Sequence, residues 1–245
     1  VGSGSIINAP LGGNIFKDSA SPIPRENIRP TLKKYIEHLG TIFPSKAHVF
    51  KSFHPVGSVG KKVISGDLDL ALDFKHFFEG TPYNKEELMM YQIQPDEWMS
   101  LYEKIKSRAR TSTEEMCKLK AFLKLIAVPI ATGGTVHVAN DKTTTGNLFT
   151  MFPQYDYHGQ TNHSVQIDWM IGSLPWLKFA YHSGESGGLK GMHRTQLLVA
   201  MLSNKGYTFM HINGIKDKET QYLVATTPKE ATELFSVFFG DCIED

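Results

Sequence analysis

Two aspartates one residue apart, Asp67 and Asp69, lie in the segment VGSVGKKVISGDLDLAL at positions 56–72. Alternate side chains of a β-strand point to the same face, so both carboxylates share a face, and the leucines between and after them share the other. Two carboxylates on one face repel each other unless a cation lies between them, and oxygen ligands at this spacing suit Mg²⁺. The spacing therefore indicates a divalent metal site, and an acidic ladder on a solvated strand face is the alternative.

The turn that precedes these aspartates contains the types of residue that bind phosphates. Gly57 lets a backbone approach closely, Ser58 supplies a hydroxyl, and Lys61 and Lys62 add positive charge. A Walker loop runs into a helix, whereas this segment runs into a strand. A helix-hairpin-helix would need about two helical turns after the glycines, and the sequence leaves no room for them. We expect Gly57 and Ser58 to contact a triphosphate, with Lys61 as its charge partner.

The composition is that of a globular protein with a substantial core. The chain has 245 residues, of which 41% are hydrophobic, enough for one large domain or two small ones. A formal charge of +1 neither requires nor excludes a nucleic-acid partner. No apolar run reaches the roughly eighteen residues that a membrane span needs. Cys117 and Cys242 are the only cysteines, so we expect no disulfide framework and a reducing, intracellular compartment, cytoplasmic or nucleoid-associated. We also expect a monomer without a membrane partner.

Local patterns predict the elements of the first half of the chain. Residues 1–25 are rich in Gly, Ser, Asn and Pro, which is typical of a flexible arm. The segment IPRENIRPTLKKYIEHLG at 23–40 has helical periodicity and Gly40 as a natural stop. AHVF at 47–50 resembles a short strand, and DLDLALDF at 67–74 alternates strictly. A helical insertion follows at about 84–128, interrupted at Pro95, with Ser112 or Thr113 opening its last helix.

The second half changes to short β-rich runs and then to mixed α/β sequence. In HSVQIDWMI at 163–171, Val165, Ile167 and Trp169 alternate with Gln166 and Asp168, so one carboxylate emerges from an otherwise buried strand. Such an aspartate on its own is more often a strand-end or turn residue.

The order Val56-Gly57-Ser58, a short spacer, then Asp67-Leu68-Asp69-Leu70 resembles the signature of the polymerase-β-like nucleotidyltransferase superfamily. The resemblance implies a third carboxylate on a neighbouring strand, for which Asp168 is the candidate. It also implies that Asp67, Asp69 and Asp168 are catalytic and bind two Mg²⁺ ions, with Mn²⁺ as a possible substitute. The family often has arginine at the position of Lys61. Lysine keeps the positive charge there but lacks the bidentate hydrogen-bonding geometry of a guanidinium group.

Downstream segments resemble the nucleotide-selecting thumb of family X DNA polymerases. Tyr181-His182-Ser183-Gly184 is similar to the turn beside the incoming nucleotide, with His182 in place of an aromatic ring. Lys205-Gly206-Tyr207 is similar to a helix end, and TPKE at 227–230 begins a similar final helix. The resemblance implies that Tyr181, His182 and Gly184 bind the nucleotide. The lyase and helix-hairpin-helix region of the larger members has no counterpart.

Together these features predict a mixed α/β (α+β) fold. We expect a nucleotidyltransferase palm at 26–175, with a mixed sheet and the helical insertion, followed by a small α/β thumb at 176–245. The implied activity is a template-dependent or gap-filling DNA polymerase, of the kind used in DNA repair. Its partners would be a nucleoside triphosphate and a DNA primer or other nucleic acid. Two alternatives stay open: transfer to another acceptor, such as an RNA or tRNA end, a small molecule or a protein, and an inactive nucleic-acid-binding module.

Overall fold

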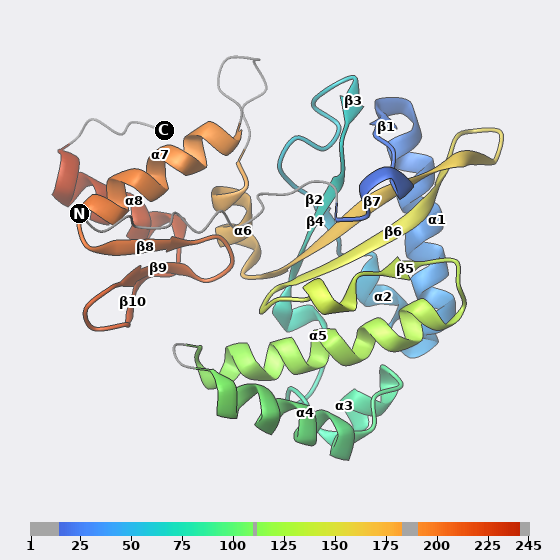
Figure 1. Ribbon diagram of the computed structural model, residues 1–245, viewed down its shortest axis with the longest axis horizontal. Coiled ribbons are helices and arrows are strands. Elements are labelled where there is room, and N and C mark those ends of the chain that lie inside the picture. The colour runs from blue at the N-terminus through green and yellow to red at the C-terminus, as the bar shows by residue number, and fades with distance from the viewer. Residues whose placement is uncertain (1–14, 110–111, 183–190, 241–245) are drawn as a thin grey trace.

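A mixed five-stranded sheet forms the centre of the computed structural model, which describes residues 15–109, 112–182 and 191–240. Its strand order is β2-β4-β7-β6-β5 (Figure 1). The strands are β2 (His54–Pro55), β4 (Leu68–Asp73), β5 (His137–Val138), β6 (Asn147–Tyr155) and β7 (Gln160–Gly172). β4 pairs with β7 in parallel, and the other three pairings are antiparallel. The predicted mixed α/β class is therefore confirmed.

Helices cover the apolar face of this sheet. The alternation predicted for the first aspartate segment is present, because Leu68, Leu70 and Leu72 of β4 are buried in the main hydrophobic core. Five helices contribute to that core: α1 (Arg25–Ile42), α2 (Ala47–Phe50), α3 (Lys85–Met90), α4 (Pro95–Arg108) and α5 (Glu114–Thr132). The opposite face of β4 and β7 packs Ala71 and Met170 against Leu177 of a later helix. The acidic side chains of Asp69 and Asp73 therefore lie on the face of β4 opposite the main hydrophobic core.

Two local predictions in the first half are wrong. The helix α1 continues past Gly40 to Ile42, and Gly40 lies where α2 approaches closely. A Cβ at Gly40 would lie 3.3 Å from Cβ of Ala47, so the glycine permits helix packing and does not end the helix. The segment at 47–50 is the helix α2, with Val49 and Phe50 buried, and not a strand. Four residues are too few for their periodicity to distinguish the two structures.

The helices predicted at about 84–128 are confirmed as α3, α4 and α5, the last of which extends to Thr132. Pro95 occupies the first turn of α4, where its missing N–H costs no helical hydrogen bond. Thr113 is the N-cap of α5, because its side chain accepts a hydrogen bond from the backbone N–H of Met116. α3 is joined to the preceding part of the core by a buried ion pair, with 2.7 Å between Nζ of Lys46 and Oε2 of Glu87.

The described part of the N-terminal arm is packed against the sheet. Ile23 is fully buried, and Ile23–Pro24 forms strand β1, which pairs with β3 (Ile64–Ser65). The side-chain amide of Gln154 donates to the backbone carbonyls of Ser21 and Pro22. The expectation of a loose arm is therefore wrong for residues 15–25, because their backbone groups find partners on the sheet. Residues 1–14 lie outside the described part of the chain.

The C-terminal third forms a smaller unit with a hydrophobic core of its own. Its elements are α6 (Leu174–Ala180), α7 (Gly191–Asn204), β8 (Tyr207–Met210), β9 (Gly214–Asp217), β10 (Leu223–Ala225) and α8 (Pro228–Phe239). The three strands form an antiparallel sheet, and Trp176, Leu202 and Phe235 lie in its core. Figure 1 shows this unit, coloured orange to red, to the left of the five-stranded sheet. Among the described helices, none has the length and apolar character required to cross a bilayer.

Candidate functional site

Three carboxylates from two adjacent strands come together at the acidic face of the sheet. Asp69 of β4 lies directly beside Asp168 of β7 in the parallel register, and Asp67 immediately precedes β4. One carboxylate oxygen from each of the three lies within 4.8 Å of the other two, and we call this group the acidic triad. Asp73, on the same face, instead accepts hydrogen bonds from the backbone N–H groups of Leu174 and Lys75. The strand pairing thus places the two sequence-predicted motifs side by side.

The acidic triad is electrostatically unfavourable without a cation. Burial raises the pKa of Asp168 to about 7, an effect that a hydrogen bond from Gln166 opposes and the charge of Asp67 reinforces. Burial, together with the charges of Asp67 and Asp168, raises the pKa of Asp69 well above its usual value. Burial also raises the pKa of Asp67. Ionising all three carboxylates together is therefore costly, and a divalent cation bound between them would stabilise their ionised forms.

The donor set fits a hard divalent cation. All three candidate ligands are carboxylates, which suit Mg²⁺ or Mn²⁺ better than softer metals. Oδ1 of the buried Asp168 has no hydrogen-bond partner among the described residues, so it is a candidate ligand atom. The residues present therefore match the Mg²⁺ or Mn²⁺ site that the sequence predicts.

Gln166 orients Asp168 within this site. The backbone N–H of Ile15 donates to Oε1 of the buried Gln166 at 2.9 Å, which leaves the amide nitrogen to donate. That nitrogen, Nε2, lies 3.0 Å from Oδ2 of Asp168. One carboxylate oxygen of Asp168 is thereby committed to Gln166, and the other stays available to a cation. In the sequence, Gln166 is distinguished only by its alternation with the apolar residues of its strand.

The glycine turn lies against the acidic triad. Gly57 has a φ of +65°, in the left-handed region that favours glycine, and a Cβ there would lie 2.9 Å from Oδ2 of Asp69. The backbone N–H of Lys61 donates to the carbonyl of Ser58, which closes the turn. Ser58 itself is partly exposed in this turn. The structure thus explains the need for glycine at 57 by its close approach to a candidate metal ligand.

A positively charged pocket adjoins this turn. It has a volume of about 270 Å³, and its walls include four predicted site residues: Gly57, Lys61, Tyr181 and His182. Lys178 and His54 complete its charged and titratable lining, and none of the described residues that line it is acidic. We call it the cationic pocket. Its position beside three carboxylates suits an anionic ligand that shares a metal ion with them.

Lys178 is the functional candidate that sequence reasoning missed. It lies on α6 one turn before Tyr181, a spacing that places both side chains on one helix face. Lys178 lines the cationic pocket together with His54, and burial and then the charge of Lys178 lower the pKa of His54. Burial, and then the charges of Arg194 on α7 and of Lys61, lower the pKa of His182. The i, i+3 spacing before Tyr181 was the available signal.

Tyr181 joins the cationic pocket to the acidic triad. Burial raises the pKa of its phenol, the charges of Asp69 and Asp168 reinforce the effect, and a hydrogen bond with Asn147 opposes it. The ring of Tyr181 also lies 5.7 Å from that of His211. His182 is exposed at the pocket wall. Gly184 lies outside the described residues, so its predicted role stays a prediction.

Comparison with known proteins leaves the site to be interpreted from its own chemistry. No family model matches the chain, and a search of curated proteins finds no significant match. The arrangement combines a candidate divalent metal site, a glycine turn and a cationic pocket in direct succession. Such a combination suits a metal-bound polyphosphate, whose negative charges the metal and the lysines would share.

Proposed function

We propose that this protein is a metal-dependent nucleotidyltransferase that moves a nucleoside monophosphate from a nucleoside triphosphate to an acceptor hydroxyl, with pyrophosphate leaving. The observation that carries the proposal is the position of Asp69. Its Cα pairs with that of Asp168 across the sheet, and its carboxylate lies where a side chain at Gly57 would be. Asp69 is therefore a candidate metal ligand that also lies against the candidate phosphate-binding turn.

The three aspartates divide the metal binding between them. Asp67 and Asp69 would bridge two Mg²⁺ ions, and Asp168 would hold the ion on the side of the nucleophile. When bound, Mg²⁺ lowers the pKa of the acceptor hydroxyl and neutralises charge on the triphosphate. Gln166 keeps Asp168 in one orientation through its 3.0 Å hydrogen bond. Asp168 would also receive the proton of the attacking hydroxyl.

The glycine turn and the cationic pocket would bind the triphosphate. Gly57 and Ser58 would present backbone N–H groups and a hydroxyl to the β and γ phosphates. Lys61 of the glycine turn and Lys178 of α6 both line the cationic pocket, and they would bind the negatively charged phosphates that leave as pyrophosphate. Tyr181 would pack beside the nucleotide, because it lies in the pocket wall and next to Asp69.

We further propose that the acceptor is the 3′-hydroxyl of a DNA primer, so that the enzyme is a DNA polymerase of the family X type. The similarity of the segments at 181–184, 205–207 and 227–230 to a family X thumb supports this acceptor. In the structure α7 ends at Asn204, just before Lys205-Gly206-Tyr207. Thr227 caps α8 in a capping box with Glu230. These features fit the expected order of helix end, strand and final helix.

A transfer assay with a panel of acceptors tests the proposal. Purified protein would be given Mg²⁺ or Mn²⁺, each labelled nucleoside triphosphate, and a primer–template, a gapped duplex, a single strand, a tRNA or a protein acceptor. We expect extension of a DNA primer, and a loss of turnover by several orders of magnitude in Asp168→Asn, which should still bind nucleotide. Transfer only to tRNA or protein would contradict the polymerase assignment. Absence of transfer to any acceptor would contradict the enzymatic proposal itself.

A further inference from the structure

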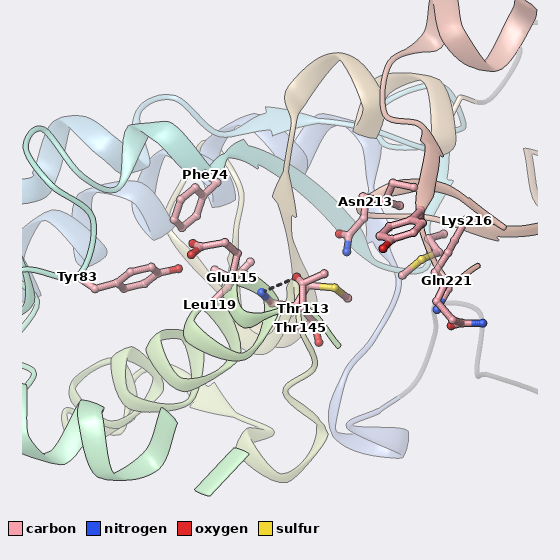
Figure 2. A pocket seen from close by; sticks show the side chains of 13 residues that line it. Phe74, Tyr83, Thr113, Glu115, Leu119, Thr145, Asn213, Lys216 and Gln221 are labelled. Carbon is pink, nitrogen blue, oxygen red and sulfur yellow. Dashed lines mark hydrogen bonds between the residues drawn. The ribbon is translucent and has the colours of Figure 1, made fainter. Parts of the chain in front are cut away.

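A second, larger pocket lies between α5 and the three-stranded C-terminal sheet. Its volume is about 430 Å³, within the range of roughly 300–1,000 Å³ typical of small-molecule sites. Apolar side chains from both sides form most of its walls: Phe74, Met116, Leu119, Met210, Tyr222 and Leu223. Figure 2 shows the two groups of lining residues facing each other. We call it the apolar pocket.

The apolar pocket is separate from the acidic triad. Asp69 lies near the start of β4 and Phe74 directly follows its end. Five residues of extended strand span about 16 Å, so the two sites lie at opposite ends of β4. The residues that line the apolar pocket include none of those that line the cationic pocket. An occupant of the apolar pocket would therefore not be the triphosphate of the proposed reaction.

Tyr83 supplies an unsatisfied hydrogen-bonding group to the apolar pocket. The residue is 9% exposed, and its hydroxyl has no hydrogen-bond partner among the described residues. Buried hydroxyl groups nearly always have a partner. Figure 2 shows this hydroxyl directed into the pocket, toward the side of Glu115 and Phe74. A ligand atom that accepts a hydrogen bond would satisfy it.

Neighbouring aromatic rings pack against the ring of Tyr83 and hold it in place. It stacks on Trp98, with ring centroids 4.9 Å apart and planes 15° from parallel. Phe78 lies against it at 4.8 Å. Its backbone φ of +63° is in the left-handed region, which is uncommon for a residue other than glycine. Residues held in such a conformation often belong to ligand-binding sites, so the backbone is consistent with a binding role for Tyr83.

Glu115 gives the pocket a hydrogen-bond acceptor close to this donor. Its carboxylate adds to burial in raising the pKa of Tyr83, and its side chain is 70% exposed, in an ion pair with Lys118. The polar edge of the pocket thus has a fixed donor, Tyr83, beside an acceptor, Glu115. The rest of the lining is mostly apolar in area, and its other polar side chains are Thr113, Thr145, Asn213, Lys216 and Gln221.

We propose that the apolar pocket binds a small, flat heteroaromatic molecule whose edge carries a hydrogen-bond acceptor beside a donor. The acceptor would receive the hydroxyl of Tyr83, the donor would face Glu115, and the ring faces would contact Phe74 and Leu119. Fused bicyclic lactams have this edge, as do several nucleobases. The proposal does not depend on the nucleotidyltransferase assignment, because it uses none of the residues of the acidic triad or the cationic pocket.

Calorimetric titration with isoquinolin-1(2H)-one, a flat bicyclic lactam, tests this proposal. Its N-methyl derivative is the comparison probe, because it keeps the acceptor and loses the donor. We expect millimolar or tighter binding of the lactam and binding of the N-methyl derivative weaker by about threefold to tenfold, the effect of one hydrogen bond. Absence of lactam binding at millimolar concentration would overturn the proposal.

Two variants make the test specific to the pocket. Tyr83→Phe should weaken binding of both probes by about threefold to tenfold, since it removes the donor that both share. The variant should fold as stably as the native chain, because the hydroxyl has no partner to lose; thermal unfolding would check this. Tyr157→Phe, the same change at an exposed tyrosine of the β6–β7 turn, should leave both affinities unchanged. Equal affinities in the native protein and in Tyr83→Phe would overturn the role assigned to Tyr83 and with it the proposal.

Discussion

At the residue scale, substitutions at two glycines separate the effect of backbone strain from the effect of contact with the acidic triad. Gly57 and Gly60 both have left-handed backbones, with φ of +65° and +72°, but only a Cβ at Gly57 would meet another atom, Oδ2 of Asp69. We expect Gly57→Ala and Gly60→Ala each to cost about 1–2 kcal/mol of stability. Only Gly57→Ala should also weaken Mg²⁺ binding, by displacing Asp69. Urea denaturation and Mg²⁺ titration measure the two effects, and equal loss of Mg²⁺ affinity in both variants would contradict the assigned contact.

Asp168 should make the metal-free protein less stable as pH rises. Burial raises its pKa from 3.8 to about 7, so the folded state binds more protons than the unfolded state between those values. Stability therefore falls as pH increases from about 4 to about 7, by up to about 4 kcal/mol from this group. Urea denaturation in EDTA across this range should show a smaller decline in Asp168→Asn. Added Mg²⁺ should also reduce the decline, and an identical pH profile in Asp168→Asn would contradict the assignment.

At the element scale, a buried ion pair connects α3 to the segment before α2. The side chain of Lys46 is fully buried, and its Nζ lies 2.7 Å from Oε2 of Glu87. Lys46→Met leaves the Glu87 carboxylate without its cation, and we expect a loss of about 3–5 kcal/mol in the free energy of unfolding. The exposed pair of Lys33 with Glu37 is the control, because Lys33→Met should cost less than about 1 kcal/mol. Equal effects of the two substitutions in urea denaturation would contradict this account of α3.

The N-terminal segment is joined to the sheet by two buried glutamines, of which only one contacts the acidic triad. Gln166 bridges Ile15 and Asp168, whereas Gln154 bridges Ser21 and Pro22 to the sheet. We expect Gln166→Leu to lower kcat by about tenfold, the effect of one lost hydrogen bond to a charged group, with little change in nucleotide KM. Gln154→Leu should lower stability without a comparable loss of kcat. Steady-state kinetics on both variants compares them, and similar kcat values would contradict the positioning role of Gln166.

At the scale of the whole molecule, local patterns predicted most elements, but not the contacts between distant ones. The alternation of β4 and the N-cap at Thr113 could be predicted because each depends on a few neighbouring residues. The adjacency of Asp69 and Asp168 depends on the parallel register of β4 and β7, so the sequence alone supported it only through a family resemblance. Lys178 and Gln166 were missed as site residues because their roles come from tertiary contacts. Gly40 was misread for the same reason, since its packing against Ala47 is a contact between two helices.

The central claim is that the acidic triad and the cationic pocket form a single site for a metal-bound triphosphate. Its most direct test is the affinity for a non-hydrolysable nucleoside triphosphate, measured by calorimetry with Mg²⁺ and with EDTA. We predict that Mg²⁺ strengthens binding at least about tenfold in the native protein, and that Asp69→Asn removes this difference. Lys178→Met should weaken binding in both conditions. An affinity that is the same with and without Mg²⁺ in the native protein would contradict the account.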